Sequence, residues 1–301
     1  MDAVTTADLS KIYGKHTALH AVDLSVPEGA VFGLLGSRHA GRTTFIRLLC
    51  GLLSPTQGSC TVLQLSPQKD PAKLHALCGV ATASAQLYRQ MSGLDNLLFF
   101  AEMYRIRPED ARERAAFLMK ALDLWELRDV PVSAYSLGAR ERLSLARAVL
   151  HRPKILFRDE PEDAIDAESA ERIAGLIADL NREEGMTAFL SVNMLKQAQS
   201  ICTAYGILQK GTMIAQGTYE SLWRNAGLSL YAEIRTAPEP PAGSSQHPGP
   251  WVRKEIESES EMPARIQKLI AEGQPVFEAR IAHPSLTEIY AAYTEPKEVL
   301  S

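Results

Sequence analysis

The sequence has 301 residues, of which 46% are hydrophobic and 23% are charged, a composition typical of a globular protein with one large domain and a small one. Its 32 basic and 36 acidic residues give a formal net charge of -4, so it lacks the positive surface that a nucleic-acid-binding protein needs. No run approaches the roughly eighteen apolar residues that span a membrane, so we expect any membrane contact to come through a partner.

The four cysteines are scattered, with no second cysteine or histidine at the spacing of a zinc or redox motif. This pattern is typical of reduced thiols in a cytosolic protein rather than of a disulfide framework. The residues are Cys50, Cys60, Cys78 and Cys202.

The segment AVFGLLG at 30–36 has the pattern of a strand, and it is followed by a glycine-rich segment and a helical pattern at 42–53. A strand, a glycine-rich turn and a helix in this order are the context of a phosphate-binding loop, because backbone N–H groups and the positive end of the helix face the phosphate. The context therefore predicts a nucleotide site between strand and helix.

The segment GSRHAGRTTF departs from the loop pattern Gly-x-x-x-x-Gly-Lys-[Ser/Thr] at its lysine. Gly36, Gly41 and Thr43 match, whereas Arg42 carries the positive charge on a longer, planar group. His39 adds a Cβ that can narrow the turn. The retained residues predict phosphate binding and a hydroxyl for Mg²⁺, with a turn that binds no ligand as the alternative.

Further strand patterns alternate with helical patterns along the next part of the chain, which predicts an α/β domain with a largely parallel sheet. The strands are expected at 79–83, 154–160, 187–192 and 204–211, and the helices at 96–106, 140–151 and 168–184.

One of these strands, KILFRDE, ends in two acids, Asp159 and Glu160. The first acid after a strand beside a phosphate loop can hold Mg²⁺ through water, and the second can polarise an attacking water. Arg158 interrupts the apolar run and either pairs with Glu160 or extends its charged end to solvent.

The composition changes at 236–250, where prolines, glycines and serines predict a linker. Strand patterns at 228–235 and 275–282 flank it. The last helix is expected to begin at Ser285, which has capping-box spacing to Glu288. Its apolar stripe for packing contains Leu286, Ile289, Tyr290 and Tyr293.

Over about residues 1–225, these motifs resemble the nucleotide-binding subunit of ATP-binding cassette (ABC) transporters. The resemblance implies an α/β P-loop ATPase core with a mixed, largely parallel sheet, an antiparallel β subdomain and an α-helical subdomain. Residues 226–301 would form a small α+β C-terminal domain. The implied cofactors are ATP and Mg²⁺.

The resemblance also assigns roles to residues. Tyr13 would stack on adenine, with an ordinary strand aromatic as the alternative. Thr43 and Asp159 would serve Mg²⁺, Glu160 would be the general base, and Asn193 falls where the family has a histidine at the γ-phosphate. YSLGA at 135–139 corresponds to the signature segment that faces a partner's nucleotide, with Ser136 and Gly138 retained. The implied phosphate-binding residues are Gly36, Gly41, Arg42, Thr43 and Thr44.

Several positions differ from the family pattern near the γ-phosphate. The residues are Arg42 for lysine, Ala83 for the glutamine that senses magnesium, Leu137 and Ala139 in the signature, and Asn193 for histidine. Losing one donor to developing charge commonly costs about a hundred- to a thousand-fold in rate, so slow or absent hydrolysis is expected. Asp159, Glu160 and Asp166 are retained, which leaves an active ATPase and a non-catalytic regulatory or scaffolding subunit both open.

The family resemblance implies integral membrane permease subunits and a second cassette subunit, identical or different, as partners. It places the chain in the cytoplasm, on the inner face of the membrane through the permease. The tail at 276–296 resembles the C-terminal extension of drug- and polysaccharide-exporter ATPases, and this favours an exporter over a soluble cassette protein.

Overall fold

The computed structural model describes residues 1–82, 87–159, 166–192, 194–236 and 251–295. The chain divides between Tyr219 and Glu220 into two compact units. Within the described ranges, no helix is long and apolar enough to cross a lipid bilayer.

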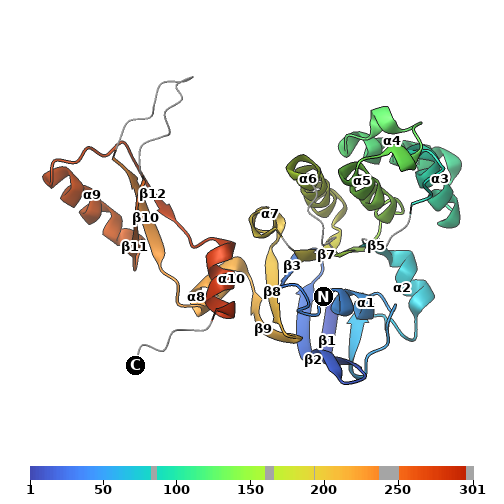
Figure 1. Ribbon diagram of the computed structural model, residues 1–301, viewed down its shortest axis with the longest axis horizontal. Helices are drawn as coiled ribbons and strands as arrows, with labels where there is room; N and C mark the ends of the chain where they lie inside the picture. The colour runs from blue at the N-terminus through green and yellow to red at the C-terminus, as the bar shows by residue number, and fades with distance from the viewer. Residues whose placement is uncertain (83–86, 160–165, 193, 237–250, 296–301) are drawn as a thin grey trace. The chain divides into compact units, whose positions relative to one another are not determined.

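The first unit is built on a sheet with the strand order β5-β6-β7-β3-β8-β9 (Figure 1). Its neighbouring strands are parallel except for β9, which pairs antiparallel with β8. The strands are β3 (Val31–Leu35), β5 (Cys78–Thr82), β6 (Ile155–Asp159), β7 (Thr187–Val192), β8 (Ala204–Gln209) and β9 (Thr212–Gly217).

A second, antiparallel sheet has the order β2-β1-β4, formed by β1 (Asp2–Tyr13), β2 (His16–Pro27) and β4 (Gln57–Val62). The main hydrophobic core includes buried residues of both sheets and of helix α1 (Arg42–Leu49). At its centre the ring of Phe189 lies 5.0 Å from that of Phe32 and 5.8 Å from that of Phe45. These contacts fix α1, and with it the preceding loop, against β3 and β7.

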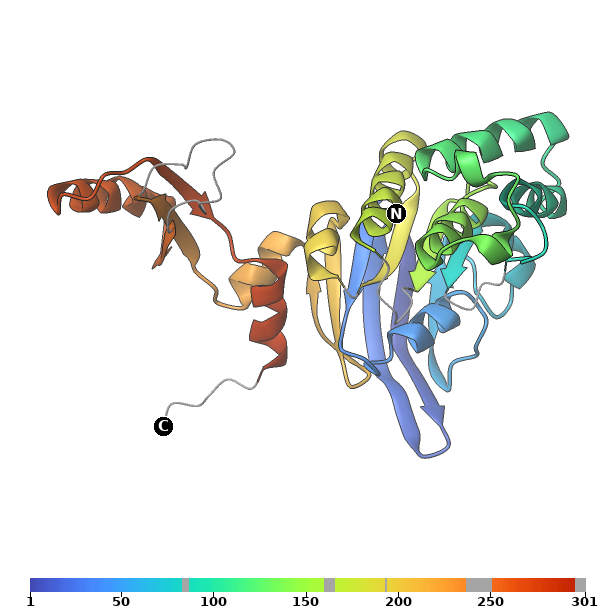
Figure 2. The same cartoon turned by 45° about the horizontal axis from the view of Figure 1, so that its top comes forward.

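The remaining helices of this unit are α2 (Pro71–Leu77), α3 (Gly93–Met103), α4 (Pro108–Ala121), α5 (Leu137–Ala148), α6 (Ala167–Glu184) and α7 (Leu195–Ile201). Figures 1 and 2 show α5 and α6 on the face of the sheet opposite to α1. A buried ion pair joins α4 to the end of α6, because Nη1 of Arg114 lies 2.7 Å from Oε1 of Glu184.

The second unit contains α8 (Tyr219–Asn225), which spans the boundary between the units, β10 (Leu230–Arg235), β11 (Trp251–Ile256), α9 (Met262–Ala271), β12 (Glu278–Ala282) and α10 (Leu286–Thr294). Its antiparallel sheet has the order β11-β10-β12. One face packs on α9 through a small core of Ala232, Ile234, Ile256 and Met262.

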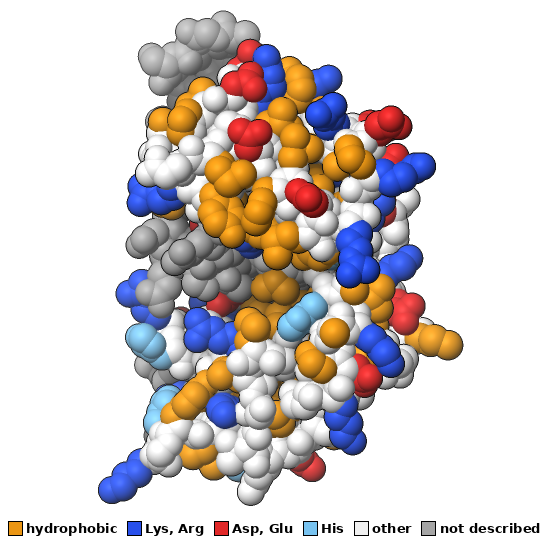
Figure 3. Space-filling view, turned by 90° about the vertical axis from the view of Figure 1, so that its right-hand side faces the viewer, with side chains coloured by type: hydrophobic (Ala, Val, Ile, Leu, Met, Phe, Trp, Pro, Cys, Tyr) orange, Lys and Arg blue, Asp and Glu red, His pale blue; other side chains and the backbone are white. Residues whose placement is uncertain are grey.

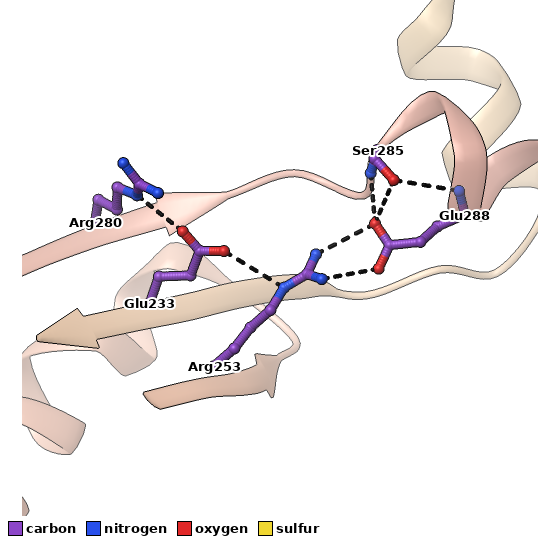
Figure 4. A network of polar contacts seen from close by, with 5 residues as sticks. All are labelled: Glu233, Arg253, Arg280, Ser285 and Glu288. Atoms are coloured by element: carbon purple, nitrogen blue, oxygen red, sulfur yellow. Dashed lines mark hydrogen bonds and ion pairs between the residues drawn. The ribbon is translucent and has the colours of Figure 1, made fainter. Parts of the chain in front are cut away.

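The other face of this sheet carries a polar network (Figure 4). Glu233 lies 2.8 Å from Arg280 and 3.5 Å from Arg253, and Arg253 also pairs with Glu288 at 3.0 Å. Burial raises the pKa of Glu288, but hydrogen bonds from Ser285 and Arg253 outweigh it and leave this pKa below its ordinary value. The sheet therefore has an apolar face and an ionic face.

The structure confirms the α/β class and the strands expected at 30–36, 79–83, 154–160, 187–192 and 204–211. The capping box of Ser285 and Glu288 is present, with Leu286 and Ile289 fully buried. The helix expected at 42–53 ends at Leu49, and β11 was not predicted. The domain boundary at 225 stays a prediction, as does the linker at 236–250, most of which lies outside the described residues.

Candidate functional site

The loop between β3 and α1 takes its shape from two glycines that lie against other segments. A Cβ on Gly36 would lie 2.6 Å from the carbonyl oxygen of Leu208, and one on Gly41 would lie 2.5 Å from that of Ala18. Gly41 also has a φ of 106°, which favours glycine. His39 has a left-handed backbone, with a φ of 66°. The loop is thus tied to β2 and β8, and its shape depends on both glycines.

A cavity of about 300 Å³ opens beside this loop. It brings together the loop, the first turn of α1 and the ends of β6 and β7. The residues that line it are His16, Ala18, Arg38, His39, Ala40, Gly41, Arg42, Thr43, Thr44, Asp159 and Ser191.

The charges around the cavity suit an anion held with a metal ion. The described lining residues include two arginines, Arg38 and Arg42, and a single carboxylate, Asp159, which ends β6. The hydroxyl of Thr43 and the carboxylate of Asp159 are oxygen ligands, the kind that Mg²⁺ prefers. The start of α1 adds N–H groups and the positive end of the helix dipole. This donor set fits Mg²⁺ bound together with phosphate groups.

Arg42, the first residue of α1, also makes a contact outside the loop. Its Nη1 donates a hydrogen bond of 2.5 Å to the backbone carbonyl of Val192, the last residue of β7. Arg42 therefore lines the cavity and also contacts the end of a neighbouring strand.

The structure does not bring every expected site residue into the cavity. Tyr13, at the end of β1, is 44% exposed and does not line it, whereas His16, its partner on β2, does. Lys11 lies over the Tyr13 ring at 5.2 Å from its centroid. Gly36 shapes the loop without lining the cavity.

The signature residues lie at the start of α5 and do not line this cavity. Ser136 caps the helix by accepting a 3.1 Å hydrogen bond from the backbone N–H of Ala139. Leu137 is 40% exposed, whereas Ala139 is buried at 2%. Of the two substituted positions, therefore, Leu137 is the one that a partner chain could contact.

The proposed general base Glu160, the γ-phosphate position Asn193 and the sensor position Ala83 lie outside the described residues. The lining residues that were not expected from the sequence include the two basic side chains of His16 and Arg38. Arg38 stands at a variable position of the loop pattern, and His16 belongs to a separate sheet, so neither gave a motif signal.

A second hollow of about 300 Å³ lies where α1, α2, α3, α5 and β5 meet. Figure 3, which views this side of the first unit, shows hydrophobic side chains gathered around a hollow. Arg147 stacks over the ring of Phe100 at 5.0 Å, and burial raises the pKa of the Cys78 thiol to about 12. Its walls are formed by Cys50, Leu52, His75, Cys78, Val80, Phe100, Tyr104, Arg147 and Ala148.

The family model described as "ABC transporter" matches residues 19–163. The chain is 31% identical over 73% of its length to the linearmycin resistance ATP-binding protein LnrL of Bacillus subtilis, covering 70% of that protein. It is 31% identical over 76% of its length to the daunorubicin/doxorubicin resistance ATP-binding protein DrrA of Streptomyces peucetius, covering 69% of it. The match to the uncharacterized ABC transporter ATP-binding protein YhcH of B. subtilis is 29% identical and covers 94% of this chain and 93% of YhcH.

Among solved structures, an ATP-binding subunit of an ABC transporter superimposes with a TM-score of 0.69. It is 22% identical and covers 75% of this chain and 94% of its own. This likeness shows the cassette fold.

Proposed function

This chain belongs to the ABC transporter family of ATP-binding proteins, and we propose that it binds ATP with Mg²⁺ for an exporter and hydrolyses it slowly. The similarity to two drug-resistance ATP-binding proteins supports the exporter assignment. The observation that carries nucleotide binding is the cavity in which Gly41, Thr43 and Asp159 meet.

In this proposal the phosphates lie on the backbone N–H groups of the loop and the start of α1, within the positive field of Arg38 and Arg42. Thr43 and Asp159 hold Mg²⁺, and Thr44 adds a hydroxyl to the phosphate side. Mg²⁺ neutralises the phosphate oxygens when bound. Tyr13 and His16 lie on the paired ends of β1 and β2, where the base would be recognised.

Slow hydrolysis is supported by the substituted residues. Asn193 stands where the family has a histidine that donates to the γ-phosphate, and Ala83 stands where it has a glutamine that contacts magnesium. Arg42 replaces the lysine and donates one hydrogen bond to the carbonyl of Val192. Such losses need not add, so the combined rate effect does not follow from single values.

Two alternatives differ in the amount of hydrolysis. An active ATPase is favoured by Asp159, which lines the cavity, and by Glu160, which follows it in the sequence as the proposed general base. A non-catalytic regulatory or scaffolding subunit would function through nucleotide binding without hydrolysis. Asn193 would then contribute to binding only.

ABC ATP-binding subunits partner with membrane permease components and dimerise. We propose that a permease segment docks in the second hollow, whose apolar wall of Leu52, Val80 and Phe100 suits a short apolar helix face. Ser136 and Gly138 would meet the nucleotide of a second cassette subunit, identical or different. Attachment to the permease would hold the chain at the inner face of the membrane.

Titration calorimetry with Mg²⁺ and a non-hydrolysable ATP analogue tests binding, and saturable heat is expected. No heat at millimolar analogue, which means binding weaker than about -4 kcal/mol, would refute it. The rate of phosphate release by the wild-type chain tests turnover, and the Glu160→Gln variant gives the rate to subtract. A rate of about one per second or more would rule out slow hydrolysis.

A further inference from the structure

We propose that Arg42 is a positioning residue, which holds the end of β7 against the start of α1, and that lysine at this position would weaken the site instead of repairing it. The inference rests on the proposed nucleotide-binding function, but its geometry is present in the chain without nucleotide. It gives Arg42 a role beyond that of a substitute for the lysine charge.

The hydrogen bond from Arg42 to Val192 joins the start of α1 to the end of β7, beside the phosphate loop. Val192 is 4% exposed and pairs in register with Leu35, the last residue of β3. The phosphate loop starts directly after Leu35 and ends at Arg42. The 2.5 Å bond from Arg42 to the Val192 carbonyl therefore ties the far end of the loop to the strand beside its near end.

The chemistry of the two side chains explains why lysine is no equivalent. A lysine ammonium sits on a side chain shorter by one bond and offers one nitrogen, whereas a guanidinium presents several N–H groups in a rigid fork. Arg42 can thus donate from Nη1 to Val192 and still present N–H groups to the cavity that it lines. Lysine keeps the charge, but its donors share one nitrogen and reach less far, so it cannot hold the same two directions in a rigid fork.

The bond also bears on how the site reads the terminal phosphate. The residue after Val192 in the sequence is Asn193, which is expected to face the γ-phosphate. If Arg42 sets the backbone next to Asn193, its loss reduces affinity for an ATP analogue more than affinity for ADP. If Arg42 contributed only its charge, Arg42→Lys would bind the ATP analogue and ADP as tightly as wild type.

The test compares wild type with Arg42→Lys, Arg42→Met and a matched control, Arg47→Lys, in the full-length chain. Arg47 is an exposed arginine in the last turn of the same helix. Amide hydrogen exchange over 187–192 is measured without nucleotide. Affinities for the Mg²⁺ complexes of a non-hydrolysable ATP analogue and of ADP are measured by calorimetry.

Both Arg42 variants should exchange faster at the end of β7, by about tenfold or more, because a charge-assisted hydrogen bond is lost. Arg42→Lys should also lower the ratio of analogue affinity to ADP affinity by about tenfold, whereas Arg47→Lys should behave like wild type. The proposal would be overturned if Arg42→Lys exchanged its amides over 187–192 at the wild-type rate. It would also be overturned if this variant bound the ATP analogue as tightly as wild type or more tightly. If the wild-type chain binds no nucleotide, the proposed function fails and the exchange experiment alone decides on Arg42.

Discussion

Gly138 packs so closely against the carboxylate of Asp166 that a Cβ has no room between them, and the hydroxyl of Ser169 closes the same space. Asp166 caps α6 by accepting a 2.7 Å hydrogen bond from the backbone N–H of Ser169. The signature glycine is therefore needed inside its own chain, where it lets the start of α5 lie on the start of α6.

Gly138→Ala is expected to destabilise the protein by about 1–3 kcal/mol, because the added methyl group has to displace the cap of α6. The matched control is Gly175→Ala, on the exposed surface of α6, where a Cβ would meet no atom within 4 Å. The control should be stabilised by about 0.5–1 kcal/mol. Urea unfolding of both variants measures the difference, and equal effects would contradict the packing argument.

Asp159→Asn should make nucleotide binding insensitive to Mg²⁺. The amide keeps the shape of the side chain but loses the charge that the hydrated ion needs, so we expect affinity in the presence of Mg²⁺ to fall by about tenfold. Asp179→Asn on the exposed face of α6 is the control. Calorimetry with and without Mg²⁺ measures the effect, and an unchanged dependence on Mg²⁺ would remove Asp159 from the metal site.

Restoring family residues at Ala83 and Asn193 together should raise turnover. Each of Ala83→Gln and Asn193→His restores one polar contact, worth about a hundred- to a thousand-fold when the rest of the site is intact. Because such groups act as a unit, the double variant should exceed the product of the single gains. Phosphate release is the readout, and Glu160→Gln in the same background should abolish it. A double variant no faster than wild type would show that other residues limit the rate.

The free energy of unfolding should fall as the pH rises above about 9, because buried thiols must stay protonated in the folded chain. Burial raises the thiol pKa from 9.0 to about 11 at Cys60 and to about 12 at Cys78. This contribution is fully present below the unfolded value of 9.0 and is lost as the pH rises toward the folded values. Urea unfolding between about pH 7.5 and about pH 10.5 should give a flatter profile for the Cys60→Ala, Cys78→Ala double variant. Parallel profiles would contradict this origin.

Limited proteolysis should cut within 236–250, where prolines and glycines disfavour regular structure. The resulting N-terminal fragment should still bind the ATP analogue, since the described residues that line the nucleotide cavity all precede the cut. Mass spectrometry locates the cut and calorimetry tests the fragment. A fragment that has lost binding would show that the second unit is needed for the site.

The first unit was predictable where local sequence determines structure. The strands around Phe32, Phe157 and Phe189 are short apolar runs bounded by turns, and the phosphate loop has its own spacing signal. Partners from distant segments were not predictable. The bond of Arg42 to Val192 spans 150 positions, and no sequence pattern specifies it.

Strand β11 shows the same limit in the second unit. Its residues WVRKEI contain Arg253, Lys254 and Glu255, which conceal the alternation of a strand. Arg253 is accommodated because it lies 3.7 Å from the centroid of the Tyr231 ring and pairs with acids on the ionic face. Only the assembled sheet explains why charged residues occupy a strand there.

The two-faced sheet of the second unit makes the stability of this unit depend on dissolved salt. Few side chains are fully buried on its apolar face, and its ion pairs are partly exposed, with Arg280 58% and Arg253 39% accessible. Dissolved salt screens such pairs over about 8 Å at physiological ionic strength. Added salt should therefore lower the melting temperature of the second unit, and heating should give two calorimetric peaks. In a cell with high internal ionic strength, the C-terminal unit would therefore be closer to unfolding than it is in dilute buffer.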